Sequence, residues 1–357
     1  MDTAALRAQF PVLDRFTYLN AGTAGPWPHA ASVALRESVE AGERDGRLLE
    51  WFMGGRDIGE RLRAAYAALL GAPSEDVALT SCTSDGIARV LGGLELAPGD
   101  EVITSEGEHP GLLGPLAAAI AQRGVSVREV PFMRVADEVG PATRLVACSH
   151  VHWATGEIAP AALADLDVPV LLDGAQGIGA VPVRVRELGC AFYAGSGQKW
   201  MCGPVGTGML WVDPAWQERV MQRGPTYLNL DAPNEGLASG LQPDARRYDT
   251  PSLGTERVAA ALASHDVLAA AGWDAVHARS AGLAATLAAA LADAGQEVLP
   301  RADTTLVTWR SDDPAAVRER ATERGVLIRD IPKQPWLRAS TGAWNDEDDL
   351  QRLLDAL

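Results

Sequence analysis

The chain has 357 residues, of which 47% are hydrophobic and 22% charged, a composition ordinary for a globular protein with a large core. Its formal net charge of −16 disfavours nucleic acid and anionic membranes as partners, because both require clustered Lys and Arg. No apolar run approaches the roughly 20 residues of a membrane span, and the N-terminus lacks the basic and apolar pattern of a signal peptide, so we expect a cytoplasmic protein.

The first 70 residues combine a turn that suits a ligand site with helical segments. Residues 17–28 read as an apolar strand followed by a Gly/Pro-rich turn, and the turn begins at Asn20. Such a turn lines a binding site about as often as it merely connects a strand to a helix. Residues 30–70 then predict amphipathic helices that end at Gly71.

A short strand predicted over 77–80 runs into a turn rich in hydroxyl groups. This turn, residues 81–86, contains Thr83 and Ser84 and precedes a helix over 87–91. The free backbone N–H groups of a helix start, together with hydroxyl donors, form a phosphate site. A plain helix cap by Thr83 or Ser84 is the common alternative, and it does not exclude phosphate binding.

His109 follows the strand predicted over 101–104 and precedes a proline. In that position its ring can lie flat against an aromatic ligand. A lone histidine in a loop is more often only solvated, so a role for His109 in ligand binding depends on which residues lie near it.

Cysteine and histidine usage gives weak support for a metal. Cys148, His150 and His152 share strand parity and would point to one face of the sheet. No further cluster supplies the remaining ligands of a zinc site, so we expect no metal. The four cysteines form no CxxC pair, which predicts buried thiols rather than a disulfide scaffold.

An apolar run over 168–172 predicts a buried parallel strand, and this strand ends at Asp173. A carboxylate at such a position is costly unless it pairs with a cation. A protonated pyridine nitrogen is one such cation. A salt bridge to an arginine and a helix cap are the alternatives.

The stretch over 194–208 places a single lysine, Lys199, among glycines and almost no charge. Desolvation removes the proton of a buried lysine and leaves a nucleophilic amine. Schiff-base chemistry, most familiarly with pyridoxal phosphate (PLP), needs such an amine. An ordinary exposed loop lysine explains this stretch, taken by itself, equally well.

Strands alternate with helices from about 77 to 212, which predicts an α/β fold with a mostly parallel sheet and helices on both faces. The hydroxyl turn, His109, Asp173 and Lys199 all follow strand ends, where such sheets bind ligands. Motifs for dinucleotides, nucleoside triphosphates and a serine nucleophile elbow are absent.

The last third of the chain differs from this pattern. An irregular segment is predicted over 223–247, and a long Ala-rich helix over 256–294 is broken near Gly272. Strands are then expected over 304–309, 325–329 and 336–340, with a helix over 314–324 and a last helix over 346–357. We expect this tail to form a smaller α+β domain, made of residues 1–16 and 246–357, beside a large domain of residues 17–245.

The motif Ser-Gly-Gln-Lys-Trp…Gly-Pro-Val-Gly-Thr-Gly, with Asp-Gly-Ala-Gln upstream, resembles the class V aminotransferase and cysteine desulfurase-like family of fold-type I PLP-dependent enzymes. The likeness extends from Tyr18 to Asn345. It implies a PLP-binding large domain, a smaller C-terminal domain and a homodimer whose active site lies at the subunit interface.

The resemblance also implies a role for each matching residue. Lys199 would form the Schiff base and later move the α-proton, Asp173 would pair with the pyridine nitrogen, and His109 would stack on the ring. Gln176 would bond the ring hydroxyl. The implied phosphate ligands are Thr83, Ser84, Ser196, Gln198 and, reaching over from the other subunit, Thr250. The implied substrate ligands are Asn20 and Arg338, the latter as the clamp of the carboxylate.

Three departures from the family pattern bear on the reaction. Gln198 stands where a histidine is common, and Trp153 stands where an asparagine is common. Residues 328–336 lack the mobile catalytic cysteine of desulfurases. We therefore expect a carbon–sulfur lyase that eliminates a thiol or persulfide from cysteine, cystine or a cysteine S-conjugate and releases pyruvate and ammonia.

Other functions remain open from the sequence. An aminotransferase or amino-acid epimerase of the same fold is the first alternative. A catalytically silent binding protein and a metal-dependent hydrolase built on Cys148, His150 and His152 are more distant. The candidates for side-chain specificity, each equally suited to packing, are Trp27, Trp153, Tyr227 and Trp336.

Overall fold

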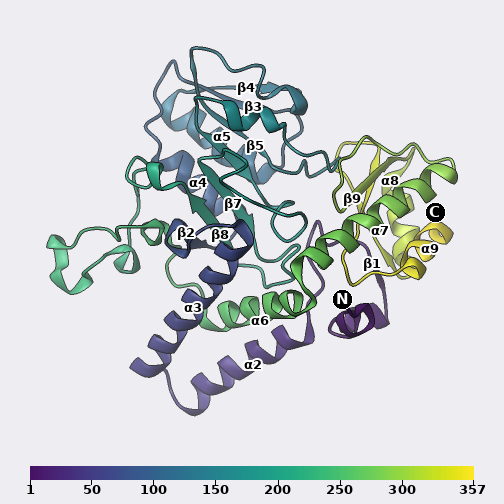
Figure 1. Ribbon diagram of the computed structural model, residues 1–357, viewed down its shortest axis with the longest axis horizontal. Coiled ribbons are helices and arrows are strands. Elements are labelled where there is room, and N and C mark those ends of the chain that lie inside the picture. The colour runs from purple at the N-terminus through teal and green to yellow at the C-terminus, as the bar shows by residue number, and fades with distance from the viewer.

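A seven-stranded sheet is the frame of the molecule, shown in Figure 1 as a computed structural model of residues 1–357. Its order is β2-β8-β7-β6-β5-β3-β4, and only β8 runs antiparallel to its neighbours. The strands are β2 (Val77–Thr80), β3 (Glu101–Ser105), β4 (Ser126–Val130), β5 (Thr143–Ser149), β6 (Val170–Asp173), β7 (Phe192–Ser196) and β8 (Gly208–Val212). The mostly parallel sheet predicted from the sequence is confirmed.

Both faces of this sheet are covered, which explains the continuous apolar runs of its strands. Along β6, Leu171 belongs to one buried cluster, whereas Val170 and Leu172 belong to another on the opposite face. The first cluster lies under α4 (Thr83–Gly93) and α5 (Pro110–Arg123). The second lies under α3 (Leu49–Leu70) and the loops around it.

Two smaller sheets hold the C-terminal region together, at the right of Figure 1. The antiparallel order β11-β12-β9 is one, and β1 paired in parallel with β10 is the other. The elements are α1 (Thr3–Arg7), β1 (Thr17–Tyr18), β9 (Leu306–Arg310), α8 (Pro314–Glu323), β10 (Val326–Leu327), β11 (Arg329–Asp330), β12 (Trp336–Ser340) and α9 (Glu347–Ala356). The single strand expected over 325–329 is thus divided between two sheets, because β10 and β11 have different partners.

Two consecutive helices link the parts of the molecule. α6 (Thr255–Ala271) packs against α2 (His29–Arg44) and α3, below the large sheet in Figure 1, whereas α7 (Trp273–Asp293) packs against β9 and α9. The break near Gly272 is confirmed, since this glycine stands between the two helices with a φ of 85°. The domain boundaries expected from the sequence stay a prediction.

By length and composition alone, α7 is apolar enough to cross a membrane, whereas we expected no such segment. Its buried residues Leu283, Leu287 and Leu291 lie in one cluster with Trp309 of β9. A core helix passes the same test, so the finding is weak evidence for a membrane.

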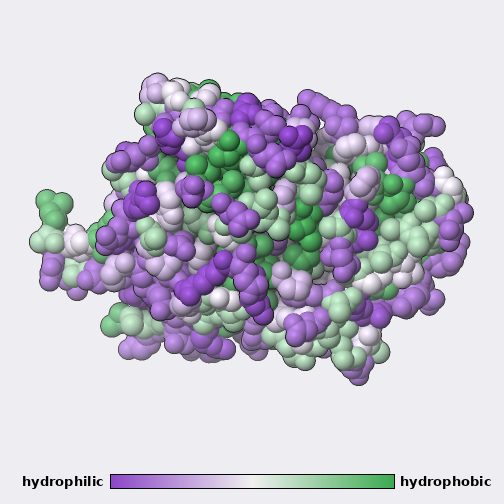
Figure 2. Space-filling model, turned by 45° about the horizontal axis from the view of Figure 1, so that its top comes forward, coloured by the Kyte–Doolittle hydropathy of each residue, from purple (hydrophilic) through white to green (hydrophobic).

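Residues 223–247 project from the body as the irregular segment at the left of Figure 1. They contain short 3₁₀ turns and one isolated bridge between Leu230 and Leu241, and no α-helix or strand, as the irregular pattern predicted. Leu237 within this segment is fully exposed, and Figure 2 shows hydrophobic atoms at the tip of the projection. Exposed apolar groups of this kind suit contact with another protein surface.

Candidate active site

The carboxyl ends of neighbouring parallel strands bring the predicted residues to one edge of the large sheet. Asp173 is the last residue of β6, and its register partner Ser149 is the last residue of β5. Ser196 ends β7, and Lys199 follows it in the connection to the antiparallel β8. His109 follows β3 and is the N-cap of α5. This edge is where open α/β sheets bind ligands.

Lys199 is half-buried, and its amine makes no hydrogen bond or salt bridge. The pKa of Lys199 is lowered to about 8, mainly by burial; the charge of Asp173 opposes this change, and the charges of Arg338 and Arg329 add to it. An amine with such a pKa has an appreciable neutral fraction near pH 7 and can act as a nucleophile or base. The alternative of an ordinary exposed lysine does not fit these surroundings.

Asp173 is buried and forms no salt bridge with any arginine. One oxygen accepts the backbone N–H of Ala175 at 2.9 Å. Burial raises the pKa of Asp173 to about 6, and the nearby charge of Lys199 opposes this rise. A buried carboxyl that lacks a cation partner within its own chain suits a bound cation, such as a protonated pyridine nitrogen.

The His109 ring is uncharged near neutral pH. Burial lowers the pKa of His109 to about 4, with further contributions from Lys199, Arg329 and Arg338. Its Nδ1 accepts the backbone N–H of Gly111 at 3.0 Å, so the ring proton is on Nε2. An uncharged imidazole with a fixed tautomer is suited to stacking on an aromatic ring.

The predicted phosphate ligands surround the start of α4. Its N-cap is Cys82, which makes no side-chain cap bond, so the alternative of a plain helix cap by Thr83 or Ser84 does not hold. The Thr83 and Ser196 hydroxyl oxygens instead lie 2.6 Å apart. Gln198 has a buried Oε1 with no hydrogen-bond partner. The backbone N–H groups and hydroxyl groups at the start of this eleven-residue helix fit an anion, whereas Gln198 Oε1 is an acceptor and would not bind a phosphate.

Ser84 and His109 are neighbours across the turn at the start of α5. A Cβ at Gly111 would lie 2.7 Å from Ser84 Oγ and 3.0 Å from His109 Nδ1, so only glycine leaves room for both. This close approach links the candidate phosphate ligands to the candidate ring ligand.

Two predicted cofactor ligands have other partners within this chain. Gln176 donates to the carbonyl oxygen of Gly22 at 2.8 Å and accepts from Trp200 Nε1 at 2.9 Å, which leaves one amide N–H free. The Thr250 hydroxyl bonds to Asp85 and Arg89 of α4. The roles of both residues toward a cofactor stay predictions.

Arg338 faces the site from β12 and is fully buried. Its Nη1 donates to the backbone oxygen of Trp153 at 2.5 Å and its Nη2 to Thr23 Oγ1 at 3.4 Å, while Nε has no partner. Burial lowers the pKa of Arg338 to about 9. The Thr23 hydroxyl in turn donates to Asn20 Oδ1 at 2.7 Å, which places Asn20 at the margin of this group.

Arg329 is a second cation at the site that the sequence analysis missed. It is the antiparallel register partner of Arg338, so both side chains leave the sheet on one face. Its Nη1 donates to Thr23 Oγ1 at 3.2 Å, and its guanidinium carbon lies 5.7 Å from the centre of the Trp153 ring. The signal in the sequence was a basic residue in the cysteine-free stretch 328–336, considered there only for its missing thiol.

Trp153, which replaces the family's asparagine, forms one wall beside these arginines. Its ring meets the His109 ring edge-on at 5.2 Å, and its indole N–H donates to the backbone oxygen of Gly107 at 2.8 Å. The centre of the ring also lies 5.9 Å from the guanidinium carbon of Arg338. The indole therefore joins the ring-binding side of the site to the substrate side.

The expectation that Cys148, His150 and His152 share one strand face is wrong, because β5 ends at Ser149. His150 Nδ1 lies 3.0 Å from the Tyr193 hydroxyl, and His152 Nδ1 lies 3.1 Å from Thr155 Oγ1. No group of three His, Cys, Asp or Glu side chains is placed to hold a metal ion.

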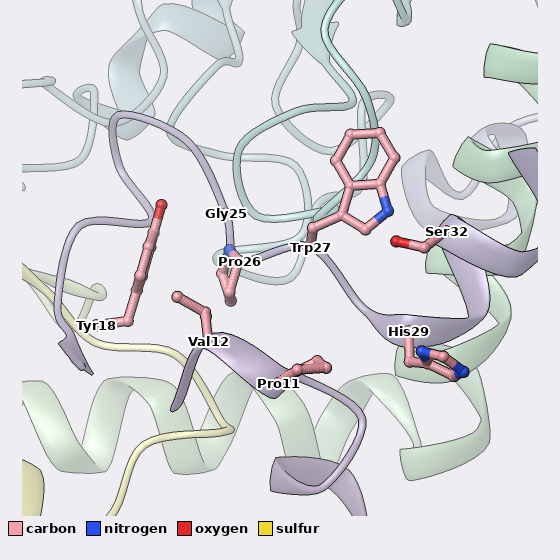
Figure 3. Close-up of a pocket in the computed structure, with 8 residues that line it drawn as sticks. All are labelled: Pro11, Val12, Tyr18, Gly25, Pro26, Trp27, His29 and Ser32. Carbon is pink, nitrogen blue, oxygen red and sulfur yellow. The ribbon is translucent and has the colours of Figure 1, made fainter. Parts of the chain in front are cut away.

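A separate cavity of about 390 Å³ lies at the N-terminal turn, and Figure 3 shows the side chains around it. It is lined by Pro11, Val12, Tyr18, Gly25, Pro26, Trp27, His29 and Ser32. Trp27 therefore lines this cavity. Only Gly25 connects the cavity wall to the lysine segment, through a 2.8 Å hydrogen bond from its N–H to the backbone oxygen of Gln198.

A family model described as aminotransferase class-V matches residues 55–353. The chain belongs to this family. The solved structure of a C-DES variant with glycine linked to PLP has a TM-score of 0.92 and 25% identity, and the match covers 98% of both chains. The protein is thus a PLP-dependent class V aminotransferase-like enzyme, and the seven-stranded α/β fold with a small C-terminal sheet agrees with that structure.

Other relatives carry several activities. A probable cysteine desulfurase of Methanothermobacter thermautotrophicus is 31% identical over 249 residues, which are 64% of this chain and 62% of that protein, so the match spans less than two thirds of its length. Isopenicillin N epimerase of Streptomyces clavuligerus is 28% identical over 385 residues, 95% of this chain and 93% of the enzyme. The cystine C–S lyase C-DES bound to its reaction product cysteine persulfide has a TM-score of 0.91 at 24% identity over 97% of this chain and 98% of its own, a likeness of fold.

Proposed function

We propose that this enzyme is a carbon–sulfur lyase that acts by β-elimination on cystine or a similar cysteine derivative with a second carboxylate. The observation that carries the proposal is the pair Arg329 and Arg338, side by side on β11 and β12 and facing Lys199, in a segment without a cysteine. Among the similar structures, that of the cystine C–S lyase C-DES agrees with this choice of reaction.

The residues present fit PLP. Asp173 would face the ring nitrogen, and His109 would face the plane of the ring. The hydroxyl groups at the start of α4, those of Thr83 and Ser196, would bind the phosphate. When bound, PLP supplies an electron sink that makes the α-proton of an amino acid acidic. Lys199 is the residue placed to take that proton, because its lowered pKa gives it a neutral fraction near pH 7.

Arg338 would bind the α-carboxylate through two parallel hydrogen bonds and so orient the Cα–H bond toward Lys199. In the free protein its Nη2 and the Nη1 of Arg329 both contact the Thr23 hydroxyl. A substrate with carboxylates at both ends would replace this shared hydroxyl by one anion on each guanidinium. Two neighbouring arginines with so few partners favour such a substrate, since each otherwise lacks a counter-charge.

The missing cysteine decides how sulfur leaves. A desulfurase transfers sulfur to a thiolate of its own, but residues 328–336 offer none. Three of the four thiols, those of Cys148, Cys190 and Cys202, are buried, and burial raises the pKa of each, so they are poor nucleophiles. The fourth, Cys82, is partly exposed, but it is the N-cap of α4 and so lies at the proposed phosphate end of the site. Sulfur would therefore depart with the leaving group as a thiol or persulfide.

A pyruvate assay with cystine, cysteine and S-methylcysteine tests the proposal. We expect the highest kcat/KM with cystine. Arg329→Gln should lower kcat/KM for cystine by about ten- to a hundredfold, the effect of losing one charged hydrogen bond, and leave S-methylcysteine nearly unchanged. The absence of pyruvate from all three substrates would end the lyase proposal.

An epimerase or aminotransferase is the second candidate, favoured by the full-length likeness to isopenicillin N epimerase. Its signature would be exchange of the substrate α-proton in D₂O without pyruvate, or conversion of the cofactor spectrum to the pyridoxamine form by an amino acid alone. If no elimination is found, the first result would replace the lyase proposal by an epimerase, and the second would replace it by an aminotransferase.

We also propose a homodimer with shared active sites. The projecting segment 223–247 with its exposed Leu237 supports a protein contact, and the groove beside Thr250 includes the aromatic side chains of Trp51 and Phe52 among charged ones. Light scattering at micromolar concentration would report the mass, and a monomer would contradict the proposal.

A further inference from the structure

Glu108 is a buried carboxyl to which the proposed reaction gives no role. Its side chain is almost fully shielded from solvent. Its Oε1 accepts hydrogen bonds from Ser105 Oγ at 2.5 Å and from the backbone N–H of Ser149 at 2.7 Å, and its Oε2 accepts one from Ser149 Oγ at 2.5 Å. Burial of a carboxyl is costly unless hydrogen bonds compensate. Burial raises the pKa of Glu108, and the hydrogen bonds from Ser105 and Ser149 oppose this rise without cancelling it.

These hydrogen bonds tie together three segments at the functional edge of the large sheet. Ser105 ends β3, Ser149 ends β5, and Glu108 lies in the loop that leads from β3 into α5. The next residue along this loop is His109. The loop cannot move away from β5 without breaking both bonds to Ser149, so Glu108 holds the backbone from which the His109 ring projects.

The same carboxyl lies close to Asp173. Ser149 and Asp173 are register partners in the parallel strands β5 and β6, so their side chains lie on the same side of the sheet. Burial is the main cause of the raised pKa of Asp173, and the charge of Glu108 raises it further, while Lys199 and the N–H of Ala175 oppose. Further titratable neighbours are the thiol of Cys148, which both carboxyls influence, and the phenol of Tyr193, which Asp173 influences.

We propose that Glu108 is a positioning residue of the cofactor site, which fixes the loop carrying His109 and places a second negative charge behind Asp173. This inference rests on the cofactor site proposed above and is independent of which reaction the enzyme catalyses. It gives a reason for keeping a buried acid where an apolar side chain would avoid the cost of desolvation.

Two variants separate the two effects. Glu108→Gln keeps the size and can still accept from Ser105 and from the Ser149 N–H, but it removes the charge. Glu108→Ala removes both. Glu106→Gln, at an exposed position of the same loop, is the matched control.

The first measurement is the titration of the Asp173 carboxyl in the apoenzyme by carbon-13 NMR, with the signal assigned through Asp173→Asn. Glu108→Gln should shift this titration to lower pH, and Glu106→Gln should not move it. An unchanged midpoint in Glu108→Gln would overturn the electrostatic part. This measurement needs no cofactor. If the wild-type protein failed to bind PLP, the proposed function would be contradicted, but the effect of Glu108 on the pKa of Asp173 could still be measured.

The second measurement is the dissociation constant of PLP together with the visible circular dichroism of the bound cofactor. Glu108→Ala should weaken binding roughly tenfold and reduce the dichroic band. If Glu108 acts through His109, then Glu108→Ala should add little to the effect of His109→Ala. Wild-type affinity and spectrum in Glu108→Ala, or fully additive effects, would overturn the positioning role. If Glu108→Ala does not fold, the Asp173 titration in Glu108→Gln decides.

Discussion

Burial shifts the charge state of three key residues at this site. It drives Lys199 toward the neutral amine, His109 toward the neutral imidazole and Asp173 toward the protonated acid, as the directions of the three pKa shifts show. Desolvation always favours the uncharged form, and the residual charges then act on one another through a medium of low polarity. A bound cationic ring would reverse this balance at Asp173 by giving its charge a partner.

The chain has two lysines, so the effect of burial on the pKa of Lys199 can be tested against the other lysine. Nitrogen-15 labelling of lysine should give two side-chain signals, from Lys199 and from the exposed Lys333. We expect Lys199 of the apoenzyme to titrate near pH 8, and Asp173→Asn to lower its pKa further, because the Asp173 charge raises it. The Lys333 signal should be the same in both proteins. A Lys199 midpoint that rises or stays fixed in Asp173→Asn would contradict this reading.

At the scale of elements, the N-terminal turn is wedged against the segment that carries the lysine. A Cβ on Gly25 would lie 2.1 Å from the backbone oxygen of Lys199, so no side chain fits there. The 2.8 Å hydrogen bond from Gly25 N–H to Gln198 O fixes the two segments to each other. The turn that holds Asn20 and Thr23 therefore keeps a fixed place beside Lys199.

Gly25→Ala should separate these segments. We expect a loss of about 1–3 kcal/mol in the free energy of unfolding, the usual range for overpacking, and a larger loss of activity. Gly282→Ala in α7, where a Cβ would meet nothing within 4 Å, is the control and should be neutral or stabilising by about 0.5–1 kcal/mol. Denaturant unfolding measures the free energy of unfolding of both variants. Equal values would show that the contact between Gly25 and the lysine segment leaves room for a side chain.

The N-terminal helix is tied to the C-terminal helix through one buried carboxylate. Asp349 accepts from Arg7 Nη1 at 2.6 Å and from Asn345 Nδ2 at 3.0 Å. Burial raises the pKa of Asp349, but hydrogen bonds from Arg7, Asn345 and Arg352 outweigh it and leave the pKa below its usual value. The carboxylate therefore stabilises the fold above the unfolded pKa, and this contribution is lost as pH falls through the lower folded pKa.

Asp349→Asn should destabilise the protein near neutral pH by about 1.5–3 kcal/mol, because Arg7 and Arg352 lose a charged acceptor, while Arg7 keeps its ion pair with Asp346. The difference from wild type should shrink below about pH 4, where the wild-type acid begins to protonate. Denaturant unfolding at pH 7 and pH 3.5 measures it, with the exposed Asp348→Asn as control. A difference that does not depend on pH would show that charge is not the cause.

At the scale of the whole molecule, Thr250 distinguishes a shared site from a self-contained one. In its own chain its hydroxyl is engaged with Asp85 and Arg89, whereas Ser196 bonds to Thr83. A role at the phosphate would then have to be exercised in the second subunit of the proposed homodimer. Complementation between two inactive chains tests that arrangement directly.

Lys199→Ala and Thr250→Val chains, mixed in equal amounts and refolded, should recover about a quarter of wild-type activity if Thr250 acts across the interface. Half of the dimers would be mixed, and one of their two sites would carry no lesion. Each chain alone is the control and should stay largely inactive. No recovery in the mixture would show that Thr250 serves its own subunit or has no role.

The sequence determined the fold class and the edge of the sheet where the site lies. Apolar runs ending at Asp173 and at the glycine-rich lysine segment are local patterns, and parallel strands bring their carboxyl ends together without further information. The motif around Lys199 identified the family for the same reason, because a short contiguous stretch holds its main residues.

Only the tertiary structure decided which side chains meet across long distances. Arg329 joins the site because it is the register partner of Arg338. Glu108 contacts the end of β5, and the ring of Trp153 lies beside both arginines. The supposed face shared by Cys148, His150 and His152 disappeared because β5 ends between the first two. Strand ends and strand partners depend on packing between segments far apart in the chain, and no local pattern encodes them.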